Sequence, residues 1–446
     1  MAEKFCIVGA GAAGIGSALA FVEHGLEFDI LEAGYEVGGH WNHGYDILHL
    51  ITSRDTTGYP GYPMSEQYPE FPSRGQVLEY LQSVANMHQI HDRIHFGQTV
   101  EKISRTDTGH WLVRTQGREL EYAGVLIATG HLRQPRIPDI AARFTGQSIH
   151  SKDYRNTVSL AGESVLVVGS GNSGCDIAVD CAQHLLDTDI VIRSSQGFLP
   201  KSFFGVPRAE LDWVNKLPGI LRKPVTDLLA RVTLGRNERY RGLPSHEKLP
   251  EEDDIPVINS LLLYWIQHGR ADVTPGIADI RGREVEFTNG TRKTYDSIIW
   301  ATGYEVTVPG IGERLRWQNG CPVTFGSSIF PAGADEEFDN LYLVGFIAPR
   351  GPQIPVYHRQ ASLIARAIRL RQAGQPVRRI IWDDSSTAHQ IDIVRQTWDK
   401  NMLALEGLLD KQFAQHPVRA DFHFGDGTDD GSDQASAHAA TGAEHA

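Results

Sequence analysis

The sequence predicts an α/β protein built from two Rossmann-like dinucleotide-binding domains, with the second domain inserted into the first. Two glycine-rich turns of spacing G-x-G-x-x-G carry this prediction, one at Gly9–Gly14 and one at Gly169–Gly174. Each turn follows a short apolar run and precedes a helical pattern, and a second apolar run comes after the helix. That order is a βαβ unit with parallel strands, and it occurs twice in the 446 residues.

The first βαβ unit begins near the N-terminus. Residues 4–8 predict a strand, and the helix after the turn is expected to end near Gly25, because glycine is favoured at helix C-termini. Phe28–Leu31 predicts the second buried strand, which ends at Glu32. The stretch Phe5–Val22 carries no charge, but nine of its 18 residues are Gly or Ala. We therefore expect a strand, turn and helix here, and neither a signal peptide nor a membrane span.

Three further patterns complete the first unit. Gln76–Met87 has the spacing of an amphipathic helix, and His95–Ser104 and His110–Gln116 predict strands of a small sheet. The chain then closes on the apolar run Val125–Gly130.

The second unit follows the same plan. Ser164–Val168 and Asp189–Arg193 predict its first two strands, on either side of the second glycine turn and its helix. Val285–Thr294 predicts a hairpin, because the Asn-Gly pair at 289–290 is a strong turn sequence. The hairpin leads to the apolar run Ile298–Tyr304, which parallels the ending of the first unit.

These patterns place the domain boundaries. Residues 1–155 and 306–424 are expected to form the first, discontinuous domain, and residues 156–305 the second, with a partly helical surface insertion at about 205–270. The segment 425–446 holds five acidic residues and no Lys or Arg, so we expect a disordered tail.

Composition excludes several classes of function. The 42 basic and 55 acidic residues give a net charge of −13 and a pI near 5.8, which argues against nucleic acid as a partner. The four cysteines cannot build a disulfide scaffold, and no pair has C-x-x-C spacing. The four are Cys6, Cys175, Cys181 and Cys321. Reduced thiols and the lack of a membrane span predict a cytoplasmic protein.

The first glycine turn has the chemistry of a dinucleotide site. Gly9 makes the tight turn, Gly11 lets the backbone approach a pyrophosphate, and Gly14 permits close helix–strand packing. The helix N-terminus supplies N–H groups and partial positive charge to that anion. Glu32, 23 residues after Gly9, is placed to accept a hydrogen bond from a free ribose 2′-OH and to repel a 2′-phosphate.

The second turn differs at the position that selects the cofactor. The equivalent offset from Gly169 falls on the pair Ile192-Arg193. The guanidinium of Arg193 can bind a 2′-phosphate with two hydrogen bonds. Lys201 is a further cation nearby in the sequence. Asp187 and Asp189 argue against a 2′-phosphate at Arg193, because their carboxylates would repel it. The second site is therefore expected to take NADPH, with NADH as the less favoured alternative.

Two adjacent nucleotide sites are best explained by hydride transfer from a nicotinamide in the second site to a flavin, FAD, in the first. One segment of the chain resembles a sequence that identifies a known enzyme family. Phe144–Tyr154 is similar to the F-x-G-x-x-x-H-x-x-x-Y identifying sequence of the flavin-containing monooxygenases, which are class B flavoprotein monooxygenases, and it precedes the second glycine turn as in that family.

Four further segments match the family in the same order along residues 1–370. Glu32 followed by Gly38–Trp41 resembles the segment around the flavin, and Gly169–Gly174 resembles the NADP-binding G-x-G-N-S-G. The other two matches are Trp300–Tyr304, and Leu341–Phe346 with Gly351 and Gln360 after it.

The resemblance implies a glutathione-reductase-like arrangement and a set of cofactor contacts. The residues implied for FAD are Gly9, Gly11, Ala13, Gly14, Glu32, Gly39, His40, Trp41, Val100, Thr129 and Gly345. Those implied for NADP are Gly169, Ser170, Gly171, Asn172, Ser173, Gly174, Arg193, Ser194, Thr302 and Gly303.

The resemblance also implies a reaction. NADPH reduces FAD, the reduced flavin reacts with O2, and the resulting C4a-hydroperoxyflavin oxygenates a soft nitrogen or sulfur nucleophile, an amine or a sulfide, of a small molecule. Baeyer–Villiger oxygenation of ketones by the same intermediate is an alternative. The identifying sequence of the Baeyer–Villiger enzymes ends in Trp, however, and this chain has Tyr154 at that position. A flavin- and NADPH-binding protein that does not oxygenate is a second alternative. The resemblance implies a homodimer.

One segment departs from the family. Ile51 occupies the position where an Asn is usual near the flavin, and it is followed by Thr52, Ser53 and Arg54, which become candidate neighbours of the flavin peroxide. No side chain is assigned as catalytic, because no nucleophile triad or carboxylate pair is present. His150 of the identifying sequence is expected to link the two domains.

The 19 histidines raise the question of a metal. Two trios are closely spaced, but neither has a carboxylate or cysteine partner at a ligand spacing, so we predict no metal site. The trios are His40, His43 and His49, and His88, His91 and His95.

Overall fold

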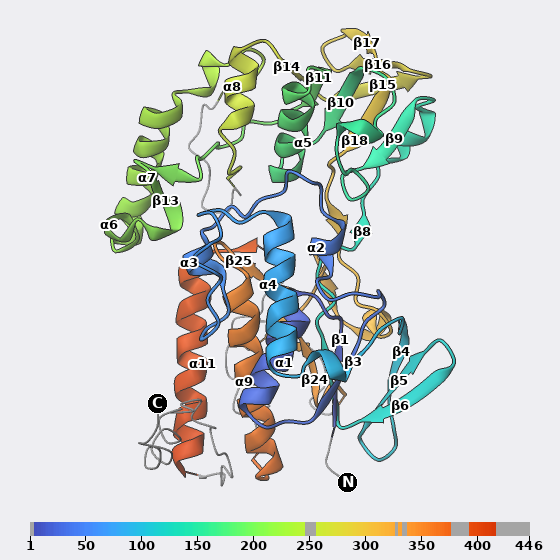
Figure 1. Cartoon of the computed structure of the whole chain (residues 1–446), viewed down its shortest axis with the longest axis vertical. Coiled ribbons are helices and arrows are strands. Elements are labelled where there is room, and N and C mark those ends of the chain that lie inside the picture. Colours follow the sequence, from blue (N-terminus) through green and yellow to red (C-terminus); the bar gives the residue numbers. More distant parts are fainter. Residues whose placement is uncertain (1–3, 246–255, 326–328, 332–336, 376–391, 416–446) are drawn as a thin grey trace, which may run out of the picture.

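A computed structural model describes most of the chain, and its two sheet-containing units are stacked along the long axis of the molecule (Figure 1). The described residues are 4–245, 256–325, 329–331, 337–375 and 392–415. The lower unit holds the N-terminal strands and the C-terminal helices, and the upper unit holds the middle of the chain.

The main sheet of the lower unit has five parallel strands in the order β24-β7-β1-β2-β3. From one edge these are Leu341–Leu343, Gly124–Ile127, Phe5–Val8, Phe28–Leu31 and Ile94–His95. Because β24 comes from beyond residue 340 and pairs with β7, the sheet closes only after the upper unit has been completed. This confirms the predicted insertion of one dinucleotide-binding fold into another.

The main sheet of the upper unit is also parallel, in the order β14-β11-β10-β18-β9. From one edge these are Ala271–Thr274, Asp187–Val191, Ser164–Val168, Ser297–Trp300 and Gln147–His150. In both sheets the strand before the glycine turn is central, at the point where the strand order reverses. Open parallel sheets bind ligands beyond the carboxyl ends of the strands at such a point.

Helices cover the sheets. In the lower unit α1 (Ala12–Glu23) packs along α9 (Ile354–Gln372), with α11 (Arg395–Gln415) beside α9 (Figure 1). The amphipathic helix predicted at 76–87 is α4 (Arg74–Met87), and Ser73 and Gln76 close its N-terminus with a capping box. In the upper unit α5 (Asn172–Gln183) follows the second glycine turn.

Smaller elements complete the two units. Two antiparallel three-stranded sheets occupy equivalent places in them, and the predicted Asn-Gly hairpin is confirmed as β16 and β17. Their strands are β4 (Val100–Arg105), β5 (Trp111–Thr115), β6 (Arg118–Tyr122), β15 (Ile277–Arg281), β16 (Glu284–Phe287) and β17 (Arg292–Thr294). Short elements used below are α2 (His40–His43), α3 (Arg54–Thr57), β12 (Ser202–Phe203), β13 (Val206–Pro207), α6 (Asp212–Asn215), α7 (Gly219–Leu234) and β25 (Ala348–Pro349).

The structure differs from the sequence prediction at three boundaries. β9 pairs with β18, so the chain joins the upper sheet at Gln147, before the boundary predicted at 155. β11 ends at Val191, two residues earlier than predicted. Helix α8 (Leu261–Gln267) buries Leu262 and Leu263 in the upper core, so the end of the predicted insertion at 205–270 belongs to the domain itself.

Two predictions concern the chain's surroundings. No helix among the described residues is long and apolar enough to cross a membrane. The acidic tail predicted at 425–446 lies outside the described residues.

Tyr154, the last residue of the identifying sequence, ties the linker between the units to helix α5. Its side chain is fully buried, and its hydroxyl donates a hydrogen bond of 2.6 Å to Oδ2 of Asp180. Desolvation and the neighbouring Asp180 carboxylate raise the pKa of the Tyr154 hydroxyl, so this group stays protonated and remains a donor.

We expect Tyr154→Phe to lower the free energy of unfolding by about 1–3 kcal/mol, because the buried Asp180 carboxylate loses its donor. Urea unfolding followed by tryptophan fluorescence measures the change. Tyr264→Phe is the control, since the Tyr264 side chain is half exposed and its hydroxyl has no hydrogen bond within the described chain. Equal stability of the two variants would contradict the anchoring role.

Candidate functional site

The first glycine turn is shaped by the absence of side chains. Gly9 has φ +106°, a conformation that favours glycine. A Cβ on Gly14 would lie 1.8 Å from the carbonyl oxygen of Gly9, so helix α1 can start this close to β1 only with glycine there. A Cβ on Gly11 would meet nothing nearer than the Cα of Gly39 at 3.6 Å, which leaves the mouth of the turn open.

Other residues predicted for FAD gather around this turn. Glu32 accepts hydrogen bonds from the backbone N–H groups of Ala10 (2.6 Å) and Gly34 (2.7 Å), and its carboxylate oxygens retain lone pairs for further donors. A Cβ on Gly345 would lie 3.2 Å from the Cβ of Ala13. Segments separated by more than 300 residues therefore meet at the N-terminus of α1.

The surrounding polar groups fit a bound dinucleotide. Thr129, whose Cα lies 3.5 Å from the position a Gly9 Cβ would take, has a buried Oγ1 without a hydrogen-bond partner in the structure. Buried polar atoms are normally paired, so this hydroxyl is available to a ligand. Val100 is different, because its buried side chain packs in the core with Val8 and Leu31.

Two histidines flank this region and are held neutral. His40 is partly exposed, but desolvation of its imidazole, with the neighbouring His131 and His43, lowers its pKa to about 4. His131, which the sequence did not single out, contacts the Gly345 carbonyl oxygen through Nδ1 at 3.2 Å, and burial lowers its pKa. Trp41 lies beside His40 in an edge-to-face contact. The site thus presents neutral rings near the first turn.

The second glycine turn has the same construction. Gly169 has φ +117°, and a Cβ on Gly174 would lie 2.0 Å from the Gly169 carbonyl oxygen. A Cβ on Gly171 would meet no atom within 4 Å. The protein therefore does not need glycine at 171 for its own packing, and the open space above it suits a pyrophosphate.

Several residues predicted for NADP are already engaged by the protein. The Oδ1 of Asn172 accepts a hydrogen bond of 2.8 Å from the backbone N–H of Ile258. The Thr302 hydroxyl donates to the carbonyl oxygen of Arg136. Ser173 interacts with the hydroxyl of Tyr45, which donates to Asp176 at 2.8 Å. These side chains shape the site and join the two units.

Arg193 lies beyond the end of β11. Its side chain is exposed, and its Cγ lies 3.4 Å from the position of a Cβ on Gly276. The guanidinium forms no hydrogen bond or ion pair with the described residues, and the neighbouring Ser194 is exposed as well. Lys201 does not join this group, because its Nζ sits 5.4 Å from the centre of the Phe71 ring.

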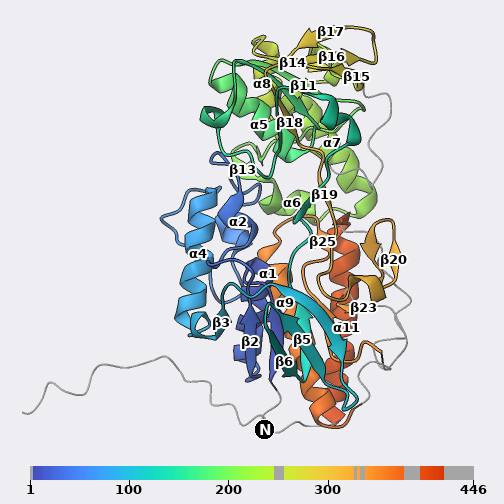
Figure 2. The same cartoon turned by 90° about the vertical axis from the view of Figure 1, so that its right-hand side faces the viewer.

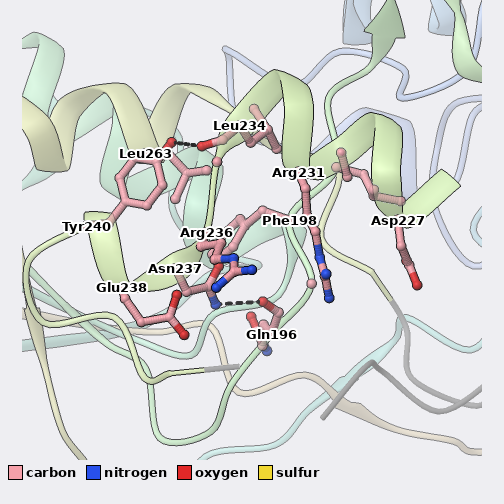
Figure 3. Close-up of a pocket in the computed structure, with 14 residues that line it drawn as sticks. Gln196, Phe198, Asp227, Arg231, Leu234, Arg236, Asn237, Glu238, Tyr240 and Leu263 are labelled. Carbon is pink, nitrogen blue, oxygen red and sulfur yellow. Dashed lines mark hydrogen bonds between the residues drawn. The ribbon is translucent and has the colours of Figure 1, made fainter. Parts of the chain in front are cut away.

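A pocket of about 300 Å³ begins three residues after Arg193 (Figure 3). Gln196 and Phe198 line it together with Arg231 on α7 and Arg236 after that helix, so two guanidinium groups belong to its lining. None of the lining residues was predicted as a site residue. No sequence pattern marks this pocket, because the charges of α7 resemble those of an ordinary solvent-exposed helix.

His150 lies on β9 beside β18, and its contacts stay within the upper unit, so its role in linking the two domains stays a prediction. Its Nδ1 accepts a hydrogen bond from the backbone N–H of Lys152 (3.1 Å), so its Nε2 carries the proton and donates to the carbonyl oxygen of Gly303 (3.0 Å). Burial lowers the pKa of the imidazole. His150 is therefore a neutral residue that ties the end of β9 to the segment after β18.

The segment at 52–54 is largely occupied by local contacts. Thr52 is buried and its hydroxyl contacts that of Thr57 at 2.8 Å. Ser53 is buried and its hydroxyl donates to the carboxylate of Glu210 in the upper unit. Arg54 donates from Nε to Asp55 (3.1 Å). Ile51 is 38% exposed, so it supplies no polar group where the family usually has Asn.

The metal question can be examined in the part of the chain that the structure describes. No group of three or more His, Cys, Asp or Glu side chains in it is placed to hold a metal ion.

A scan against protein-family models matches residues 2–394 to the family described as FMO-like, flavin-binding monooxygenase-like. The chain belongs to this family. It is 32% identical over 361 residues to "Probable indole-3-pyruvate monooxygenase YUCCA8" of Arabidopsis thaliana, covering 76% of this chain and 83% of that protein. It is 26% identical over 396 residues to the human "Putative dimethylaniline monooxygenase (N-oxide-forming) 6", covering 82% of this chain and 72% of that protein.

The fold is shared with solved flavin monooxygenases. The structure titled "Oxidized steroid monooxygenase bound to NADP" superposes with a TM-score of 0.66 at 19% identity, covering 92% of this chain and 98% of that one. This flavin monooxygenase thus has two dinucleotide-binding domains, uses FAD, NADPH and O2, and acts on a small molecule.

The two second-turn glycines give a matched test. We expect Gly171→Ala to fold normally and to raise KM for NADPH by about tenfold or more, because its Cβ has free space in the protein but enters the space of the pyrophosphate. Gly174→Ala is expected to misfold or lose stability, since its Cβ collides with the Gly169 carbonyl. Steady-state kinetics and thermal unfolding check both, and an unchanged KM in Gly171→Ala would refute the assignment.

Arg193 tests the cofactor preference. We expect Arg193→Ala to raise KM for NADPH much more than KM for NADH, because only NADPH carries the 2′-phosphate. Arg270→Ala, which removes another exposed arginine of the upper unit, is expected to change neither constant. Equal effects of Arg193→Ala on the two cofactors would rule out the 2′-phosphate role.

Proposed function

We propose that this monooxygenase transfers one atom of O2 to a soft nitrogen or sulfur nucleophile, an amine or a sulfide, of a small molecule. The human relative named for N-oxide formation supports nitrogen as the oxygenated atom. The identifying sequence of this chain ends in Tyr154, whereas that of the Baeyer–Villiger enzymes ends in Trp. Tyr154 is buried and bonded to Asp180, and it favours the reaction of the flavin-containing monooxygenases.

The cofactor contacts are proposed on the geometry of the two turns. FAD is assigned to the first turn, where Glu32 is bonded to two backbone N–H groups beside the opening at Gly11. NADPH is assigned to the second turn, where Gly171 leaves open space and Arg193 has no partner among the described residues. When bound, FAD supplies the oxygen activation and NADPH the electron pair.

This chain's own residues bind, orient and exclude water around those groups. The helix N-termini at the two turns hold the pyrophosphates, and the hydrogen bond from His150 to Gly303 fixes the segment that carries Thr302. Thr52 and Ser53 are buried, and we assign them to one side of the flavin site on the family resemblance. None of them needs to transfer a proton, which suits a reaction whose oxidant forms on the cofactor.

Baeyer–Villiger oxygenation of a ketone is the second candidate function. The observation that favours it is the group of relatives named indole-3-pyruvate monooxygenases, such as the one 32% identical to this chain. Indole-3-pyruvate is a 2-oxo acid, so its reacting group is a carbonyl. We propose a cytoplasmic location on the four free, buried cysteines, and a homodimer on the family resemblance alone.

The deciding experiment uses the purified, flavin-loaded protein with ¹⁸O2 and four substrate types: a tertiary amine, a thioether, a cyclic ketone and a 2-oxo acid. We expect NADPH to bleach the flavin absorbance without air, and mass spectrometry to find one ¹⁸O atom in the amine or thioether product. Labelled ester or carboxylate from the carbonyl compounds alone would favour the second candidate. Flavin reduction with only H2O2 formed from all four would overturn both.

The FAD assignment predicts the effect of Glu32→Ala. Loss of this carboxylate removes the acceptor for the ribose hydroxyls and leaves two backbone N–H groups unpaired, at a cost of about 1–3 kcal/mol each. We expect the purified variant to retain less than about a tenth of the normal FAD content, measured by absorbance. Glu119→Ala, on exposed β6, should retain it, and full FAD content in Glu32→Ala would contradict the assignment.

A further inference from the structure

One arginine at the junction of the two units has no counter-ion among the residues that the structure describes. Arg208 follows the β12–β13 hairpin and begins a single turn of 3-10 helix, Arg208–Glu210. Its side chain is half-buried, and its guanidinium makes no ion pair or hydrogen bond with any residue that the structure describes. A guanidinium withdrawn from water without a partner is costly, so an unpaired one points to a missing anion.

The neighbours of Arg208 place it close to Ser53, which we propose to lie beside the flavin. Its backbone N–H donates to the carbonyl oxygen of Lys201 (3.0 Å), which fixes the base of the hairpin. Two residues further on, Glu210 accepts the hydrogen bond from Ser53, a candidate neighbour of the flavin. Figures 1 and 2 show β13 and α6 at the lower edge of the upper unit, above the lower unit that carries β25.

The charges around Arg208 leave it uncompensated. Arg350, just after β25, interacts with it electrostatically, and burial together with this second cation lowers the pKa of Arg208. Arg350 itself is paired with Asp392 at 2.8 Å, and the Glu210 carboxylate is engaged by Ser53. An arginine remains charged at neutral pH even so.

We propose that Arg208 binds a carboxylate of the substrate, so that the enzyme selects small molecules carrying a carboxylate some distance from the oxygenated atom. This rests on the proposed monooxygenase function and narrows its substrate class. The planar fork of a guanidinium matches the two oxygens of a carboxylate. The whole protein has a charge of −13 and repels anions at long range, so a carboxylate-bearing substrate requires a local cation.

A phosphate of NADPH is the competing anion. Its pyrophosphate is already provided for by the N-terminus of α5 at Gly171, and its 2′-phosphate by the unpaired Arg193 beyond β11. Arg208 belongs to neither place, because it lies on the 3-10 turn whose Glu210 meets Ser53. The structure therefore favours the substrate as the source of the anion.

The test compares 3-(methylthio)propanoate with its primary amide, which has the same sulfur and nearly the same shape but no charge. We expect the unmodified enzyme to show kcat/KM about 10- to 100-fold higher for the acid, as suits a hydrogen bond to a charged group. Arg208→Met should abolish this preference, leaving kcat/KM for the amide and KM for NADPH unchanged, and Arg208→Lys should restore part of it. Arg239→Met, which removes an exposed arginine of the same insertion, is the control.

Three results would overturn the proposal: no preference for the acid in the unmodified enzyme, equal losses on acid and amide in Arg208→Met, or a raised KM for NADPH in that variant. A second readout separates this proposal from the monooxygenase function. If neither compound is oxygenated, their dissociation constants are measured from the absorbance change of the bound flavin. Tighter binding of the acid that disappears in Arg208→Met supports the carboxylate site, and equal binding of acid and amide rejects it.

Discussion

The close approach of a helix N-terminus to the preceding strand is the constraint on which both nucleotide sites depend. In each unit the third glycine of the turn packs against the carbonyl group of the first glycine. A Cβ on that third glycine, Gly14 or Gly174, would lie about 2 Å from the carbonyl oxygen. Only this packing aims the free N–H groups of α1 and α5 along the carboxyl ends of β1 and β10. The anion-binding ability of the fold follows from that geometry.

The junction between the units determines how the two sites face one another. Tyr45 of the lower unit donates a hydrogen bond to Asp176 of α5, and Asn259 donates to the same carboxylate at 2.8 Å. Burial raises the pKa of Asp176, and these two donors oppose that shift by stabilising the charged form. Ser53 with Glu210 and His150 with Gly303 add further contacts between the units and along the linker.

Features coded by neighbouring residues were predictable from the sequence, and features that depend on distant pairing were not. The two βαβ units and the hairpin around Asn289 follow from local spacing, and the structure has them. The pairing of β9 with β18 joins residues about 150 apart, so the boundary at 155 was misplaced. Asn172 was assigned to the cofactor from its motif, and its bond to Ile258 depends on a segment 86 residues away. Arg208 gave no signal, because its lack of a partner is a property of the folded junction.

A crystal structure of the protein grown with FAD and NADP⁺ would show directly which turn holds which nucleotide. We expect the FAD pyrophosphate over the first turn, with its ribose on the carboxylate that follows β2, and the NADP⁺ pyrophosphate over the second turn. We also expect the nicotinamide and the flavin ring to meet at the junction of the units. A structure in which NADP⁺ fills the second turn while the first turn holds no flavin would contradict these expectations.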